Sequence, residues 1–269
     1  MAHDLLLGRG EATSEQLAVR DLTVRFGALT AVSEFSLDLL AARITALIGP
    51  NGAGKSTAFN AITGFVPAAG GTVQLGEKQL TRMSPHEVSK HGVVRTFQKR
   101  SLFPRLTVRE NLRIGFHRTE PKSVLSAVLG LPAHRRAGRE LHARIDALAE
   151  FVGLTGELDR EASTLPYGRQ RLLAVAIALA ARPTFLLLDE PTAGLNSTES
   201  AVVASLLRRV REAGVGVLLV EHDMKFLLAL SDHVAVLNAG EKIAEGSPEQ
   251  IQRDARVRAA YLGERHIAC

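Results

Sequence analysis

Three largely apolar runs stand out along the chain, at residues 44–48, 184–188 and 215–220. Runs of this length with little polar alternation are typical of strands that are covered on both faces of a parallel sheet. Residues 198–213 separate the last two runs and fit a crossover helix. The pattern therefore predicts an α/β core built on a mainly parallel sheet.

Shorter segments near the N-terminus alternate between apolar and polar residues, as half-exposed strands do. These segments are residues 17–20, 22–26, 36–39 and 71–75. They predict a small antiparallel sheet beside the core. Residues 234–237 and 242–245 predict a hairpin that turns at Asn238-Ala239-Gly240.

Residues 100–165 have a different pattern, with no sheet-forming run. Between Arg135 and Phe151, apolar residues recur at helical spacing among charged ones, which predicts an amphipathic helix. A more apolar helix is expected at residues 171–181. We therefore expect a helical insertion of about 60 residues before the parallel strands resume.

Composition narrows the class of protein. The chain is 46% hydrophobic and 23% charged, as in ordinary soluble globular proteins. Its longest apolar run, at residues 172–181, is half of the roughly 20 residues that span a bilayer. Residues 1–16 lack the apolar core of a signal peptide and predict a loose tail. The single cysteine, Cys269, excludes an intrachain disulfide and fits a reducing cytoplasm. A net charge of +5 gives no reason to expect a nucleic-acid partner.

The strongest chemical signal follows the first apolar run. Residues 49–56 fit the phosphate-binding loop G-x-x-x-x-G-K-[ST] at every fixed position, between a predicted strand and a predicted helix. Glycines let backbone N–H groups turn toward a triphosphate, and the helix N-terminus adds partial positive charge. Lys55 can reach the β- and γ-phosphates, and the Ser56 hydroxyl can bind Mg²⁺.

The second half of the site is expected at residues 185–190, an apolar run that ends in two carboxylates. Ligands of α/β folds gather at the carboxyl ends of parallel strands, so Asp189 should meet the Mg²⁺ held by Ser56. Glu190 projects elsewhere and can orient or deprotonate the attacking water. Gln98 and His222 each follow a further predicted strand, and residues 165–170 precede the apolar helix.

The order and spacing of these motifs resemble the nucleotide-binding subunit of an ABC transporter, over residues 17–265. The phosphate loop corresponds to that family's Walker A motif, Leu186–Glu190 to Walker B, Gln98 to the Q-loop and His222 to the switch histidine. Residues 165–169 lie where the family signature lies, and residues 193–196 resemble its D-loop. The implied fold is a P-loop NTPase with a RecA-like, mainly parallel core, a small antiparallel β subdomain and a helical signature subdomain.

The resemblance implies a role for each motif residue. The catalytic residues would be Lys55, Gln98, Glu190 and His222, and the Mg²⁺ ligands Ser56, Gln98 and Asp189. The nucleotide would be bound by Phe26, Gly49, Pro50, Asn51, Gly52, Ala53, Gly54, Lys55, Ser56 and Thr57, with Tyr167 and Gly168 acting on the nucleotide of another subunit. Phe26 would stack on adenine, although a plain core position fits it equally well.

Finer features resemble the ATPases of branched-chain amino acid importers. They include Arg95-Thr96-Phe97-Gln98, Tyr167 within the signature, and the ending at residues 243–251 and 260–264. Importers of urea or short-chain amides share these marks, so the transported solute stays open. The implied layout is a tail at 1–16 and one ATPase domain at 17–265. Within it, residues 17–99 and 170–265 form the core, and about 100–169 the helical subdomain.

The resemblance also implies cofactors and partners. ATP and Mg²⁺ would lie between two ATPase chains, identical or paralogous, that face each other head to tail on the cytoplasmic face of the inner membrane. Two transmembrane permease subunits would bind them, and an extracytoplasmic solute-binding protein would act indirectly. A soluble ABC ATPase acting on DNA or ribosomes usually carries coiled coils, zinc modules or duplicated halves, and none is evident here. An ATP-binding regulatory module would not need Glu190 and His222, and a P-loop kinase would not explain the signature.

Two residues depart from the family signature. Pro166 replaces a small residue, usually Ser or Ala, and Arg169 replaces Gln. Pro166 offers neither a hydroxyl nor a backbone N–H to a γ-phosphate. We therefore expect binding across the pair of ATPase chains to be retained but weaker. Arg169 adds positive charge near the signature, and the sequence leaves open whether that charge compensates.

Overall fold

The computed structural model describes residues 16–96, 102–116, 132–221 and 223–265. Residues 132–135 and 262–265 are described in backbone only. Contacts divide the chain into two compact units. Unit 1 contains residues 96–183, and unit 2 contains the described residues up to Arg95 and those from Thr184 onward. The subdivision expected from the sequence, with its boundaries at 99 and 169, stays a prediction.

Unit 2 is built on a six-stranded sheet in the order β10-β9-β3-β8-β7-β6. Its strands are β3 (Ile44–Ile48), β6 (Val93–Arg95), β7 (Phe185–Asp189), β8 (Gly216–Val220), β9 (His233–Asn238) and β10 (Glu241–Gly246). All pairings are parallel except that of β9 with β10, which form the predicted hairpin. Every residue of β3, β7 and β8 is buried, which confirms the parallel-sheet prediction.

A second, antiparallel sheet has the order β2-β1-β4-β5. It comprises β1 (Gln16–Phe26), β2 (Leu29–Leu40), β4 (Gly70–Leu75) and β5 (Lys78–Gln79). The two strands expected at 17–20 and 22–26 are in fact one strand, β1. Its register shifts between Val19 and Leu22, and Asp21 takes a positive φ of 48°, so the alternation resumes out of phase.

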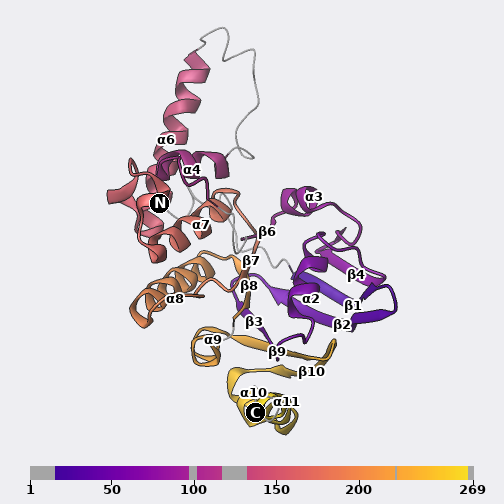
Figure 1. The fold of residues 1–269 in the computed structure, drawn as a ribbon. Helices are drawn as coiled ribbons and strands as arrows, with labels where there is room; N and C mark the ends of the chain where they lie inside the picture. Colours follow the sequence, from indigo (N-terminus) through magenta and orange to yellow (C-terminus); the bar gives the residue numbers. More distant parts are fainter. Residues whose placement is uncertain (1–15, 97–101, 117–131, 222, 266–269) are drawn as a thin grey trace. The chain divides into compact units, whose positions relative to one another are not determined.

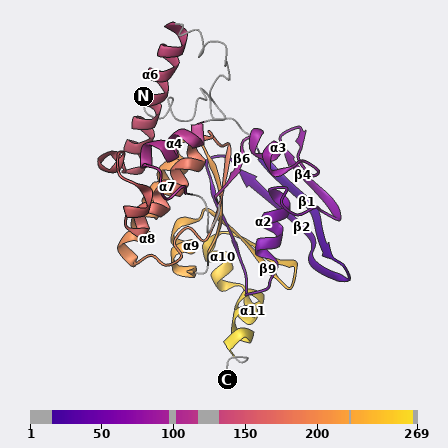
Figure 2. The same ribbon diagram turned by 45° about the horizontal axis from the view of Figure 1, so that its top comes forward.

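The helices of unit 2 are α2 (Lys55–Ile62), α3 (Pro85–Lys90), α8 (Ser197–Glu212), α9 (Met224–Leu230), α10 (Pro248–Arg253) and α11 (Ala255–Arg265). Figures 1 and 2 show α10 and α11 following the β9–β10 hairpin. One buried cluster joins both sheets and α2, with Phe35, Leu47, Phe59 and Leu187 among its members. This shared core fixes α2, and the loop before it, against both sheets.

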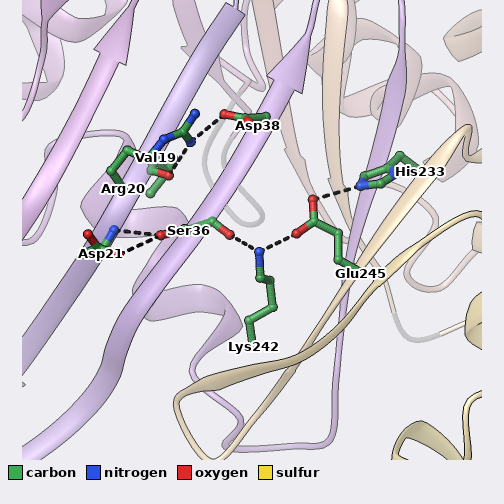
Figure 3. Close-up of polar contacts among 8 residues, drawn as sticks. All are labelled: Val19, Arg20, Asp21, Ser36, Asp38, His233, Lys242 and Glu245. Atoms are coloured by element: carbon green, nitrogen blue, oxygen red, sulfur yellow. Dashed lines mark hydrogen bonds and ion pairs between the residues drawn. The ribbon is translucent and has the colours of Figure 1, made fainter.

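Side chains also connect the antiparallel sheet to the β9–β10 hairpin (Figure 3). Lys242 Nζ donates to the Ser36 carbonyl oxygen at 2.6 Å and also pairs with Glu245. Glu245 Oε1 is 2.9 Å from His233 Nε2. Burial raises the pKa of the Glu245 carboxyl, but the bonds to Lys242 and His233 outweigh this and leave that pKa below its ordinary value.

Unit 1 is helical over its described residues, as the pattern predicts. It contains α4 (Val108–Phe116), α6 (Pro132–Val152), two short 3₁₀ turns and α7 (Tyr167–Ala180). The amphipathic helix expected at 135–151 is α6, and its apolar face at Leu141, Ile145 and Leu148 is buried. Figure 1 shows α4, α6 and α7 together. The helix expected to start at 171 starts at Tyr167, so the signature residues lie in its first turn.

Candidate functional site

The phosphate loop borders an open pocket of about 580 Å³ in unit 2. Residues 51–57 form one side, and Glu190 lies on the same pocket although it is far away in sequence. The other lining residues are Leu29, Thr30, Ala31, Val220, Ala239 and Gly240. The structure therefore brings together the two predicted halves of the site, the loop and Glu190.

Two glycines hold the loop in its shape because their surroundings leave no room for a side chain. Gly49 has a φ of +154°, and a Cβ there would lie 2.0 Å from the Leu237 carbonyl oxygen. Gly54 has a φ of +99°, and a Cβ there would lie 2.5 Å from the Ala31 carbonyl oxygen. The loop is thus wedged between β9 and β2, in a conformation that a side chain at either glycine would disrupt.

Lys55 is the first residue of α2 and is 7% exposed. Its Nζ donates to the carbonyl oxygens of Gly49 at 2.6 Å and of Pro50 at 2.8 Å. The ammonium is thereby held over the loop, at the end of the helix where the macrodipole is positive. Loop amides, helix N-terminus and ammonium form a binding site for phosphate groups.

Part of the pocket wall beside the loop comes from residues that the sequence analysis did not assign to the site. Gly240 N–H donates to the Ala53 carbonyl oxygen at 3.0 Å, and Ser33 N–H donates to the Gly240 carbonyl oxygen at 2.8 Å. The β9–β10 turn therefore links the phosphate loop to β2. The turn itself was predicted, but local sequence carries no signal that it lines the site.

The two carboxylates at the end of β7 have different surroundings. Asp189 is 6% exposed, and its Oδ2 is 3.1 Å from Arg95 Nη2 on the neighbouring strand β6. Burial lowers the pKa of the Arg95 guanidinium, whereas the charge of Asp189 raises it. Arg95 also lies over the Phe59 ring, 4.6 Å from its centroid. Sequence analysis used Arg95 only as a family mark and missed its contact with Asp189.

Glu190 has the opposite environment. It is partly exposed and lines the pocket, with a positive φ of 49°. Its N–H donates to the Val220 carbonyl oxygen at 2.8 Å, so the backbone stays tied to β8 while the side chain is on the pocket side. A carboxylate beside a phosphate site can accept a proton from an attacking water.

The signature residues lie in unit 1. Pro166 is the N-cap of α7 and makes no side-chain capping bond, Tyr167 is 47% exposed and Gly168 is buried. Arg169 donates from Nη1 to the Gly153 carbonyl oxygen at 2.7 Å, and its Nε is 3.6 Å from Glu157 Oε1. Within unit 1, the Arg169 guanidinium is thus held by the turn that follows α6.

Three other predicted site residues are Gln98, His222 and Phe26. Gln98 and His222 lie outside the described residues. Phe26 is 51% exposed and does not line the pocket, so the core alternative for it is wrong and its stacking role stays a prediction.

The described residues contain no group of three or more His, Cys, Asp or Glu side chains arranged to hold a metal ion. Mg²⁺ in phosphate sites takes only one or two protein oxygens and fills its other positions with phosphates and water. Ser56 lines the pocket and Asp189 directly precedes the lining residue Glu190, so their side-chain oxygens are compatible with such a sparse donor set. No helix in the described ranges is long and apolar enough to cross a membrane.

Comparisons with known proteins agree with this geometry. Residues 32–193 match the family model "ABC transporter", and residues 241–267 match "Branched-chain amino acid ATP-binding cassette transporter". The chain is 43% identical to the high-affinity branched-chain amino acid transport ATP-binding protein BraF of Pseudomonas aeruginosa, over 92% of this chain and 98% of that protein. It is 42% identical to LivG of Escherichia coli K12, over 92% and 98% of the two chains.

Solved structures resemble it as well. The ADP conformation of MJ1267, an ATP-binding cassette of an ABC transporter, has a TM-score of 0.80 and 30% identity, over 93% of this chain and all of that one. A nucleotide-free ATP-binding cassette from an ABC transporter gives 0.79, also at 30% identity, over 92% of this chain and 98% of that one.

Proposed function

The chain belongs to the ATP-binding proteins of branched-chain amino acid ABC transporters, and we propose that its ATPase activity energises the import of branched-chain amino acids. One observation carries the proposal. The phosphate loop and Glu190 line one pocket, in a chain that is 43% identical over 92% of its length to a transport ATP-binding protein. Membership of this family implies that the chain binds ATP and works with permease subunits.

Binding of the triphosphate rests on main-chain groups. The loop N–H groups other than that of Ala53, which donates to the Pro50 carbonyl oxygen, and the Lys55 ammonium neutralise phosphate charge as the bond from the γ-phosphorus to the bridging oxygen breaks. Lys55 leaves the carbonyl oxygens of Gly49 and Pro50 to do so. Gly240 and Ala31 line the pocket beside the loop and restrict where the nucleotide can lie.

Mg²⁺, when bound, supplies charge neutralisation between the β- and γ-phosphates. Ser56 would be its direct protein ligand, and Asp189 and Gln98 would complete the site, Asp189 through a bound water. Arg95 holds the Asp189 carboxylate at the end of β7. Glu190 orients and deprotonates the attacking water, and His222 contacts the γ-phosphate.

The signature residues Tyr167 and Gly168 act on the nucleotide of a second ATPase chain. Two such chains, a paralogue or a second copy, face each other head to tail on the cytoplasmic face of the inner membrane. They bind two transmembrane permease subunits, and an extracytoplasmic solute-binding protein delivers the amino acid.

Replacing the proposed base tests the mechanism. Glu190→Gln keeps the size of the side chain but removes its basicity, so we expect MgATP to bind while hydrolysis falls at least about a hundredfold. Isothermal titration and phosphate release measure the two quantities on the same preparation. Near-normal turnover would remove Glu190 from this role, and failure of the parent chain to bind MgATP would overturn the proposed function.

A transport assay separates the candidate solutes. The ATPase is reconstituted with its permeases and binding protein in liposomes, and uptake of labelled leucine is competed with valine, isoleucine, urea and acetamide. We expect only the branched-chain amino acids to compete. Absence of leucine uptake together with uptake of labelled urea or acetamide would assign the chain to the related importers of those solutes.

A further inference from the structure

The turn that carries Glu190 has a strained backbone. A φ of 49° places Glu190 in the left-handed region, which costs an L-residue free energy and persists only where surrounding contacts hold it. The next residue is Pro191, which has no N–H to donate. The first backbone donor after Glu190 is therefore that of Thr192.

Both hydrogen-bond donors of Thr192 contact the same carboxylate oxygen. Its backbone N–H and its Oγ1 hydroxyl each donate to Glu221 Oε1, both at 2.6 Å. Thr192 is 8% exposed and Glu221 is 5% exposed. Short hydrogen bonds to an ionised acceptor are the strong ones, and exclusion of water strengthens them further.

Two adjacent residues, Val220 at the end of β8 and Glu221 after it, thus accept hydrogen bonds from two residues of the turn. The Val220 carbonyl oxygen accepts from Glu190 N–H at 2.8 Å, and Glu221 accepts from Thr192. Glu221 also immediately precedes His222 in the chain. One carboxylate therefore connects the turn of the proposed base to the segment of the proposed γ-phosphate contact.

We propose that Glu221 is a positioning residue that, through Thr192, holds Glu190 in its strained conformation and aims its carboxylate at the attacking water. This inference rests on the proposed function, because it assigns Glu190 the role of base. Without the contact, the turn relaxes toward ordinary backbone angles and the carboxylate moves away from the pocket. Small misplacements of a catalytic group are costly in rate.

Thr192→Val tests the contact, because valine has nearly the shape of threonine but lacks the hydroxyl. We expect kcat for MgATP to fall about tenfold, the effect of roughly one hydrogen bond to a charged group. The dissociation constant for ATP should stay within about twofold, because the phosphate loop that binds the nucleotide is untouched. Thr192→Ser retains the hydroxyl and should recover most of the kcat.

Thr184→Val is a matched control. Thr184 precedes the same strand β7, is 4% exposed, and its hydroxyl has no hydrogen-bond partner among the described residues. The same substitution there should leave kcat unchanged. Equal losses of kcat in both variants, or no loss in Thr192→Val, would overturn the proposal.

Glu221→Gln provides a second test of the contact between Thr192 and Glu221. The amide oxygen can still accept both bonds from Thr192 but carries no charge, so we expect a smaller fall in kcat than in Thr192→Val. Because both changes weaken the same contact, adding Glu221→Gln to Thr192→Val should slow turnover by a smaller factor than adding it to the parent chain. Equal factors in the two backgrounds would overturn the proposal.

The Glu190→Gln variant separates this inference from the proposed function. If Glu190→Gln hydrolyses ATP normally, the base assignment fails. If Glu190→Gln is slow while Thr192→Val is normal, the base assignment stands and only the positioning role of Glu221 fails.

Discussion

The starts of α2 and α7 differ from those of α3, α8 and α10 in how their N–H groups are used. Side chains cap α3, α8 and α10 through Ser84, Asn196 and Ser247, each in a reciprocal capping box. The starts of α2 and α7 have no side-chain cap. Their N-caps are Gly54 and Pro166, neither of which has a side-chain oxygen.

Both of these uncapped starts are ones that we expect to contact phosphate. A capping side chain would compete with an anion for the same donors, so its absence leaves them available. The starts differ in their surroundings: contacts with β2 and β9 enclose the loop before α2, whereas Tyr167 in the first turn of α7 is 47% exposed. Substitutions at the glycines before α2 should therefore be costly.

Gly49→Ala should have the largest effect. Its Cβ would lie 2.0 Å from the Leu237 carbonyl oxygen at a φ that favours glycine, so we expect the free energy of unfolding to fall by about 3 kcal/mol and ATP binding to be lost. Chemical denaturation measures the first quantity. Gly52→Ala is the control, since its φ of +76° is strained but no atom lies within 4 Å of its Cβ; it should cost about 1 kcal/mol. Equal costs would contradict the wedged-loop account.

Pro166→Ser should have an intermediate effect, and in the opposite direction. The new N–H and hydroxyl at the N-cap of α7 can both reach a phosphate of the partner chain, so we expect MgATP-driven association to tighten by about 1–2 kcal/mol, roughly 5- to 30-fold. Analytical ultracentrifugation measures this in a Glu190→Gln background, which prevents turnover. Pro166→Ala restores only the N–H and should give a smaller gain. Unchanged association and ATPase rate would refute this expectation.

The smallest effect concerns the side-chain contacts between β2 and the β9–β10 hairpin. The pKa of Glu245 is lowered in the folded protein, so its contribution to stability is present above its unfolded pKa of about 4.5 and is lost as the pH falls through the folded value. Glu245→Gln should therefore reduce the loss of stability between pH 5 and about pH 3 relative to the parent chain. Urea denaturation over that range measures the difference. Parallel stability curves would show that the contact in Figure 3 contributes nothing.

Local patterns predicted the secondary structure well. The buried runs of β3, β7 and β8, the amphipathic face of α6 and the β9–β10 hairpin are all present, because burial imposes a period that the sequence must show. The irregularity at Asp21 was missed, because a register shift depends on how β1 pairs with its neighbours. The start of α7 was also missed, because Pro166 and Tyr167 carry no recognisable side-chain cap.

The site likewise combines features that local sequence predicts with features that depend on tertiary contacts. Glycine and lysine spacing alone determined the phosphate loop, and an apolar strand ending in Asp189 and Glu190 determined where carboxylates would meet it, since both are local requirements of phosphate chemistry. Folding in three dimensions set the partners of those groups: Arg95 on Asp189, Glu221 on Thr192, and Gly240 on the loop. These contacts join segments that the order of strands in the sheet brings together, and no period or motif within one segment records which distant segment will pack against it.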